Sequence, residues 1–220
     1  MAAERIVAAA GARRAVDPTL ELERTLVAPG RVLIGVDEVG RGAIAGPVAV
    51  GAVAVDPWAV EVPLGVRDSK LLSERRRETL YPAVRAWGFA RAVGFASAAE
   101  VDGHGIVAAL GLAGARAFRA LQEAGVAAAH VLLDGSHDWL SPALSAAPEV
   151  TTRTKADRDC AVVAAASVLA KVERDRHMIA ADAAHPGYGW AGNKGYAAAL
   201  HLEAIEAAGP SPLHRLTWLH

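Results

Sequence analysis

Residues 32–55 read VLIGVDEVGRGAIAGPVAVGAVAV and contain two apolar runs around a glycine-rich connection. The first run leads into Asp37 and Glu38, and the second covers Val48–Val55. This pattern predicts two antiparallel strands. Neighbouring side chains of a strand point to opposite faces, so the two adjacent carboxylates can share one site only if the backbone turns near Glu38. Gly40 would permit that turn.

The segments on either side extend this start into an alternation of strands and helices. Ser73 is a good helix N-cap, and the helix after it is expected to reach Tyr81, where Pro82 ends or kinks it. The order of elements predicts an α/β fold with an antiparallel start and a helical end. The expected strands are Val32–Val36, Val48–Val55, Phe89–Ser97, Val131–Leu133 and Glu149–Thr154, and the other expected helices are Thr19–Leu26, Ile106–Glu123, Asp157–Ala181 and Tyr196–Ala208.

The composition limits the class of protein. The 220 residues are 53% hydrophobic and 21% charged, which suits one globular domain. A single cysteine excludes an intrachain disulfide and a cysteine-rich zinc site. No apolar run approaches the roughly 18 residues of a membrane span, and the start does not resemble a signal peptide, so we expect a cytoplasmic protein without a membrane partner. The net charge of −1 leaves nucleic-acid binding open.

Two aspartates further along the chain are also candidates for a site. Asp134 follows a short apolar run in LLDG, residues 132–135. The end of a buried strand is where open α/β sheets usually carry function, but Asp-Gly is also a common turn, and both interpretations stay open. Asp157 lies near the start of a long helix, where the helix dipole favours an anion.

The helix that begins near Asp157 has a stripe of small residues that would let it lie close to a sheet. Lys171 lies fourteen positions beyond Asp157 and falls on nearly the same side. An ordinary core helix with a solvated charged end, Glu173–Arg176, explains the stripe and the charged run. That interpretation does not explain why a carboxylate, Asp157, stands at the start of the helix face that packs on the sheet. The stripe consists of Ala161, Ala164, Ala165 and Val168.

In combination these motifs resemble the ribonuclease HII family, over about Val32 to Trp218. DEVGRG, residues 37–42, and AAASVLAKVERDR, residues 164–176, are the most diagnostic segments. The matching stretches are GVDEVGRGAIAGPV, RDSKLLSERRRETL, LLDGSHDWL, KADRDCAVVAAASVLAKVERDR, HPGYGWAGNKGY and GPSPLHR. The resemblance implies a ribonuclease H-like mixed five-stranded sheet flanked by helices, with a small C-terminal helical region. We expect a loosely ordered lead-in at residues 1–30, a catalytic domain at 31–182 and a helical substrate-binding region at 183–220.

The resemblance also implies roles for individual residues. Four acids match the family's catalytic, metal-binding set: Asp37, Glu38, Asp134 and Asp157. Gly40, Arg41 and Gly42 match the turn that recognises the RNA–DNA junction at the ribose 2′-hydroxyl, and Tyr196 matches the tyrosine that packs on that sugar. Hard cations prefer oxygen ligands, so two Mn²⁺ or Mg²⁺ ions suit such a site. Without them, each close carboxylate pair repels by roughly 4 kcal/mol at 4 Å and an effective dielectric of about 20.

The function implied is that of a metal-dependent endoribonuclease that yields 5′-phosphomonoesters. Its substrates would be RNA–DNA hybrids and duplex DNA with single embedded ribonucleotides, cut on the 5′ side of the ribonucleotide by two-metal-ion catalysis. We expect it to act as a monomer. Two alternatives are a ribonuclease HIII-like enzyme that prefers long hybrids and a catalytically silent hybrid-binding protein. The sister type usually carries an extra N-terminal domain, for which 30 residues are too few.

Further residues are candidates for substrate contact. The candidates for phosphate contact are Ser69, Lys70, Lys155, Lys171, Arg176, Lys194, His214 and Arg215. Arg75–Arg77 are interpreted as a solvated helix face, and Tyr188 and Trp190 as either base-stacking or helix-packing residues. The sequence departs from the family at Ser136, where asparagine is common, and at Ala197–Ala198, which replaces a usual glycine–threonine pair.

Overall fold

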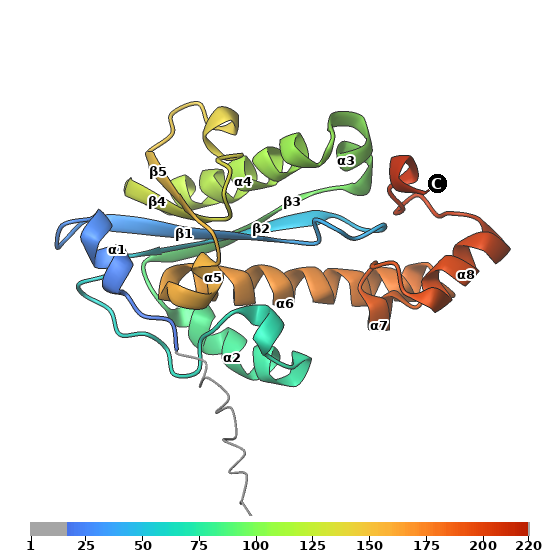
Figure 1. The fold of residues 1–220 in the computed structure, drawn as a ribbon, viewed down its shortest axis with the longest axis horizontal. Helices are drawn as coiled ribbons and strands as arrows, with labels where there is room; N and C mark the ends of the chain where they lie inside the picture. Colours follow the sequence, from blue (N-terminus) through green and yellow to red (C-terminus); the bar gives the residue numbers. More distant parts are fainter. Residues whose placement is uncertain (1–16, 220) are drawn as a thin grey trace, which may run out of the picture.

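A computed structural model describes residues 17–219 and shows a five-stranded sheet with the strand order β3-β2-β1-β4-β5 (Figure 1). The first three strands pair antiparallel, whereas β1 with β4 and β4 with β5 pair parallel. The sheet is therefore mixed, as predicted. Its strands are β1 (Val32–Val39), β2 (Val48–Val55), β3 (Ala90–Ala96), β4 (Ala128–Asp134) and β5 (Glu149–Arg153).

Helices cover both faces of the sheet. Figure 1 shows α4 (Ile106–Glu123) along one face and α6 (Ala161–Ala184) along the other, with α2 (Glu74–Ala86) outside α6. Each face of the sheet encloses its own apolar core, one under α4 and one under α6. The remaining α-helices are α1 (Glu21–Leu26), α3 (Ala98–His104), α5 (Ala156–Asp159), α7 (Trp190–Asn193) and α8 (Ala199–Ala208). Three short 3₁₀ turns are η1 (Ser69–Leu71), η2 (Ser141–Ala143) and η3 (Leu216–Trp218).

Small residues bring α6 unusually close to the sheet. A Cβ atom on Gly35 of β1 would overlap Val162, and one on Gly51 of β2 would overlap the carbonyl of Ala166. Glycines in the strands therefore meet Val162, Ala166 and Ala170 of the helix, and backbone lies close to backbone. The prediction that α6 lies close to the sheet is confirmed, but the residues against the strand glycines are not those of the predicted stripe, which is buried in the core under α6.

Several predicted boundaries were wrong for identifiable reasons. β1 stays extended through Asp37 and Glu38 to Val39, because each pairs with β2, and the backbone turns only at Gly40, with φ 82°. α2 continues past Pro82 to Ala86, since Leu80, Tyr81 and Val84 bury their side chains on that helix. The helix expected at Asp157–Ala181 is broken at Cys160, which has an extended backbone. Helices α3 and α7 were not predicted.

The ends of the expected segments also differ from the structure. Within the expected lead-in, Leu20 and Val27, which flank α1, pack on the core under α6, while residues 1–16 lie outside the described residues. The expected boundary at 182/183 falls inside α6, which continues to Ala184. Beyond it, α7 and α8 extend past the end of the sheet (Figure 1). Among residues 17–219, no helix is both long and apolar enough to cross a membrane.

Candidate active site

The sheet brings three of the four predicted acids together at the ends of two neighbouring strands. Asp37 and Glu38 lie near the end of β1, and Asp134 is the last residue of the adjacent β4. The parallel register pairs Val36 with Leu133, which places Asp37 beside Asp134 on the next rung. The Asp134 carboxylate accepts a hydrogen bond from the Ala156 amide at 2.7 Å, and this bond holds the start of α5 against β4.

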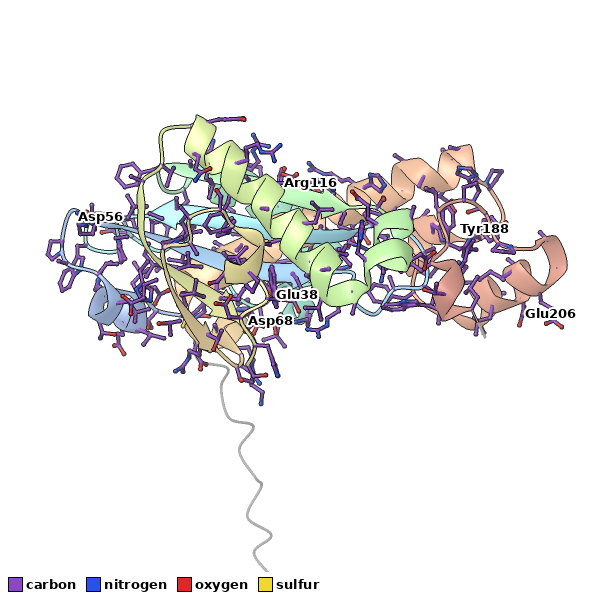
Figure 2. The ribbon with its side chains drawn as sticks, turned by 90° about the horizontal axis from the view of Figure 1, so that it is seen from above. Glu38, Asp56, Asp68, Arg116, Tyr188 and Glu206 are labelled. Atoms are coloured by element: carbon purple, nitrogen blue, oxygen red, sulfur yellow. The ribbon has the colours of Figure 1, made fainter. Side chains whose placement is uncertain are left out.

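Asp157 joins this cluster from α5. It is one residue beyond Ala156, and only 3% of its surface is exposed. The Lys70 ammonium donates to its Oδ2 at 3.1 Å. Lys70 belongs to η1, which is capped by Asp68, and Figure 2 shows Asp68 and Glu38 toward the middle of the molecule. Asp37, Asp134 and Asp157 therefore come from three separate segments and share one region. Because β1 stays extended through Glu38, the Glu38 side chain leaves the strand on the opposite face from Asp37 and adjoins the other acids only at the strand end.

Burial and like charge make this cluster unfavourable as a set of free carboxylates. Burial raises the pKa of Asp37 well above its ordinary value, and the charges of Glu38 and Asp134 raise it further. Burial also raises the pKa of Glu38 and of Asp157, and Asp134 adds to both. Burial alone would lower the pKa of Lys70, but the charges of Asp37 and Asp157 outweigh it and raise that pKa. The cluster therefore favours a cation.

Ser167 on α6 supports Asp37 and was missed by sequence reasoning. Its hydroxyl lies near the Asp37 carboxylate and acts to lower the pKa of that group. The same hydroxyl lies 2.8 Å from the Ser69 hydroxyl and 3.4 Å from the Ser69 amide. Ser69 is itself only 3% exposed, so it orders the segment that presents Lys70. A polar residue in the small apolar stripe was the available signal for Ser167.

The ligand chemistry of the cluster fits a hard divalent cation. Every candidate donor is a carboxylate oxygen, and the buried Oε2 of Glu38 has no hydrogen-bond partner. In residues 17–219, however, no three His, Cys, Asp or Glu side chains lie close enough together to form a coordination shell. The acids thus form a cluster through strand position and shared charge, and their side chains would have to rotate to coordinate an ion.

The glycine-rich turn after β1 and the predicted tyrosine lie next to each other. The amides of Ile44 and Ala45 donate to the carbonyl of Gly195 at 2.9 and 3.0 Å, one residue before Tyr196. The Tyr196 ring is 37% exposed. A Cβ on Gly42 would meet nothing within 4 Å, so internal packing does not require glycine there, and a ligand could approach the bare backbone.

The comparisons with known proteins agree with this arrangement. The family model of ribonuclease HII matches residues 34–220. The ribonuclease HII of Streptomyces coelicolor is 45% identical over 206 residues, which cover 92% of this chain and 84% of that protein. The chain belongs to the ribonuclease HII family. It is a hydrolase of the ribonuclease H class, the enzymes that hydrolyse the RNA strand of RNA–DNA hybrids.

Solved structures share the fold of this ribonuclease HII. The RNase HII of Archaeoglobus fulgidus, solved in complex with PCNA, is 27% identical with a TM-score of 0.68 and covers 84% of this chain and 93% of its own. Bst-RNase HIII, solved in complex with Mn²⁺, is 25% identical with a TM-score of 0.71 and covers 91% of this chain and 70% of its own. The fold thus matches both sister types, and the sequence relatives identify type HII.

Several basic residues of this ribonuclease HII do not lie where the sequence predicted. Arg215 and His214 are 0% and 1% exposed, so neither can reach a phosphate directly. Arg215 donates to the carbonyls of Gly40, Arg41 and Gly46. Lys194 is 6% exposed, with its ammonium 3.2 Å from Glu74. The Arg215 side chain is buried because the C-terminal segment folds back onto the glycine-rich turn, whereas the Lys194 side chain is held by Glu74 and the His214 ring by Ser211 and His201.

The remaining basic candidates of this ribonuclease HII are partly available. Lys70 and Lys155 are exposed beside Asp157, and Arg41 is exposed 3.6 Å from Glu38. Lys171 is half-buried and bonds Asp175 at 2.6 Å. Arg176 pairs with Glu78.

Three other interpretations are settled by packing. Arg77 is not solvated, because it donates to the Ser69 and Leu72 carbonyls and pairs with Asp175. Trp190 is fully buried and stacks on Tyr188 at 5.1 Å, so it serves as a packing anchor. Figure 2 places Tyr188 in the C-terminal helical part, away from Glu38. Among the family departures, Ala198 starts α8 without a side-chain cap.

Proposed function

We propose that this chain is an endoribonuclease that cuts the RNA strand of RNA–DNA hybrids and also cuts 5′ of single ribonucleotides in duplex DNA. We propose further that Asp37, Glu38, Asp134 and Asp157 hold a pair of divalent ions, Mn²⁺ or Mg²⁺. The observation that carries this proposal is the placement of Asp37 beside Asp134 on paired strands, with Asp157 delivered by the neighbouring α5. The Mn²⁺ bound by Bst-RNase HIII supports the choice of ion.

The chemistry divides between the ions and the chain. Bound divalent ions would supply a water of lowered pKa and would stabilise charge on the leaving oxygen. Asp134 is held for this task by the Ala156 amide, and the Ser167 hydroxyl favours the charged form of Asp37. Lys70 is an exposed cation paired with Asp157, and we expect it to turn to a substrate phosphate once the acids have another positive partner.

Selection of a ribonucleotide is proposed to fall to the turn and the tyrosine. A ribose differs from a deoxyribose by its 2′-hydroxyl, so a protein must contact that group to tell them apart. The open backbone at Gly42 allows main-chain groups to approach the sugar, and the exposed ring of Tyr196 can pack on it. The C-terminal helices that carry Tyr196 would then complete the substrate surface, and one chain would suffice for both tasks.

The test is cleavage of a duplex that contains one embedded ribonucleotide, measured in Mn²⁺, in Mg²⁺ and in a chelator. We expect a single cut on the 5′ side of the ribonucleotide, with a 3′-hydroxyl and a 5′-phosphate, in either metal and none in the chelator. Efficient cutting of long hybrids with poor cutting of the single site would favour the ribonuclease HIII-like alternative. Tight hybrid binding without cleavage in Mn²⁺ would favour a silent binding protein.

A comparison of two glycine-to-alanine variants tests whether the turn contributes to ribose recognition independently of folding. Gly42→Ala places a methyl group where nothing in the protein meets it, so the fold should hold while the sugar is kept away. Gly103→Ala in α3 also adds a methyl group in open space, on an element outside the turn. We expect only Gly42→Ala to weaken single-ribonucleotide cutting, by about tenfold or more. Equal activity of the two variants would remove the turn from the proposal.

A further inference from the structure

The charged run Glu173–Arg176 in the middle of α6 contains a buried arginine that the proposed chemistry does not use. Arg174 is 0% exposed and makes no ion pair with an acid among the residues that the structure describes. Burying an arginine without an acid costs several kcal/mol unless every donor is satisfied. A buried cation in this position therefore needs an explanation beyond packing.

The donors of Arg174 join two segments that are far apart in the sequence. Its Nε donates to the Pro47 carbonyl at 2.8 Å, and its Nη2 donates to the Ala45 carbonyl at 3.3 Å. Both carbonyls lie at the end of the glycine-rich turn. Its Nη1 donates to the Lys194 carbonyl at 2.9 Å, two residues before Tyr196. One guanidinium thus bonds both of the segments assigned to the ribose.

The same guanidinium lies against the two recognition groups themselves. Its Cζ is 5.5 Å from the centre of the Tyr196 ring, at cation–π distance. On the other side, a Cβ on Gly40 would overlap the Arg174 side chain. Gly40 is therefore a glycine partly because this arginine occupies the adjoining space. Lys171, held by Asp175, lies 6.0 Å from the same ring.

We propose that Arg174 is a positioning residue for ribose recognition, which fixes the spacing between the Gly40–Gly46 turn and the Tyr196 ring and so sets selectivity for a ribonucleotide over a deoxyribonucleotide. The planar guanidinium holds its donors in a rigid fork, so the directions of its three carbonyl partners are fixed together. A lysine keeps the charge but has a single rotating ammonium that cannot reproduce the fork. Arg215 supports the turn from its other side, through Gly40 and Gly46.

The test compares Arg174→Lys with the wild type and with Leu121→Ala, a destabilising core variant on α4, remote from the turn. Binding is measured by fluorescence anisotropy in a chelator, with an RNA–DNA hybrid and an all-DNA duplex of the same sequence. We expect Arg174→Lys to reduce the ratio of the two affinities by about tenfold. KM for a single-ribonucleotide duplex should rise by a similar factor, with kcat on long hybrids nearly unchanged. Leu121→Ala should lower Tm, but its ratio of the two affinities and its KM should equal those of the wild type.

An unchanged affinity ratio and an unchanged KM in a folded Arg174→Lys would overturn the proposal. If Arg174→Lys does not fold, the same affinity ratio and KM are measured for Arg215→Lys, which alters the other arginine that bonds the turn. Failure of both lysine variants to fold, while Leu121→Ala folds, would assign the arginines to the fold alone and would also overturn it. The inference rests on the proposed function, and the two can fail separately. A wild type that does not cut at a single ribonucleotide refutes the proposed specificity, whereas the affinity ratio still tests Arg174.

Discussion

The acidic cluster and the two buried arginines lie near the same end of β1. They differ in whether the protein itself supplies partners for the buried charge. The acids repel one another, and the Oε2 of Glu38 has no partner. Arg174 and Arg215 also lie close together, but their donors are used by main-chain carbonyls of the turn. Several buried carboxylates that repel one another indicate a place for a cation from outside, whereas satisfied buried donors indicate a fixed framework. An unpartnered oxygen alone does not, because the isolated Glu23 has one as well. The comparison separates the residues proposed to do chemistry from those proposed to hold a shape.

The two regions should therefore respond differently to substitution. Removing a charge from the acidic cluster should abolish activity with little loss of stability. Removing an arginine should cost stability and selectivity, with little change in kcat. The predictions below test this contrast, beginning with the largest effect.

Asp134→Asn should reduce cleavage by more than about 100-fold, a larger loss than is caused by removing a residue that only hydrogen-bonds a metal ligand. The asparagine oxygen can still accept the Ala156 amide, so the fold should persist. Cleavage of a single-ribonucleotide duplex in Mn²⁺ measures the effect. Glu123→Gln, an exposed acid at the end of α4, is the control and should be unaffected. Substantial activity in Asp134→Asn would remove the acidic cluster from the chemistry.

Arg215→Lys should lower the free energy of unfolding by about 2–4 kcal/mol, because buried carbonyls of the turn lose charged donors. Burial, together with the charge of Arg174, lowers the pKa of Arg215 to about 10, so the buried cation depends on those carbonyls. Denaturant unfolding measures the change. Arg116→Lys, at a partly exposed pair with Glu100, should cost less than about 1 kcal/mol. Equal losses at the two sites would contradict the framework role.

Divalent metal should raise Tm, because it binds the clustered acids of the folded form. At a concentration about 100 times Kd the gain is about 2.7 kcal/mol, or roughly 5–10 °C for a chain of this size. Differential scanning calorimetry in millimolar Mn²⁺ or Mg²⁺ against a chelator measures it. The shift should shrink in Asp134→Asn and persist in Arg215→Lys. An equal Tm with metal and with chelator would contradict metal binding by the acidic cluster.

Glu23 provides a buried acid outside the cluster and should show the smallest effect. Burial raises its pKa from 4.5 to about 6, although its Oε1 accepts the Val162 amide. The folded state therefore binds more protons than the unfolded state between these values. Stability should fall by about 2 kcal/mol as pH rises from 4.5 to about 6. Glu23→Gln should flatten the profile of unfolding free energy in that window, and an unchanged profile would show that another group titrates there.

Much of the fold could be predicted because its signals are local. The apolar run Val48–Val55 and the helix Ile106–Glu123 have the predicted bounds in the structure. The position of each acid at a strand end or a helix start made it a candidate, but only the resemblance to the ribonuclease HII family assigned all four to one site. Side-chain roles at the four acids stay predictions, because nothing yet tests them.

The arginines could not be predicted because their partners are distant in the chain. Arg174 lies on the same helix face as Ser167, Ala170 and Met178, all of them buried, so helical periodicity did hold a signal. Its place in a run of four charges favoured the opposite interpretation, a solvated helix end. Only the carbonyls of Pro47 and Lys194, brought in by the fold, make burial of that charge tolerable.

The central claim is that four carboxylates from β1, β4 and α5 hold a pair of divalent ions. Anomalous diffraction from crystals grown with Mn²⁺ and an RNA–DNA hybrid tests it most directly. The account predicts two manganese peaks within bonding distance of oxygens from Asp37, Glu38, Asp134 and Asp157, and fewer peaks in Asp134→Asn. Manganese bound elsewhere, with these four side chains free of metal beside the bound hybrid, would contradict it.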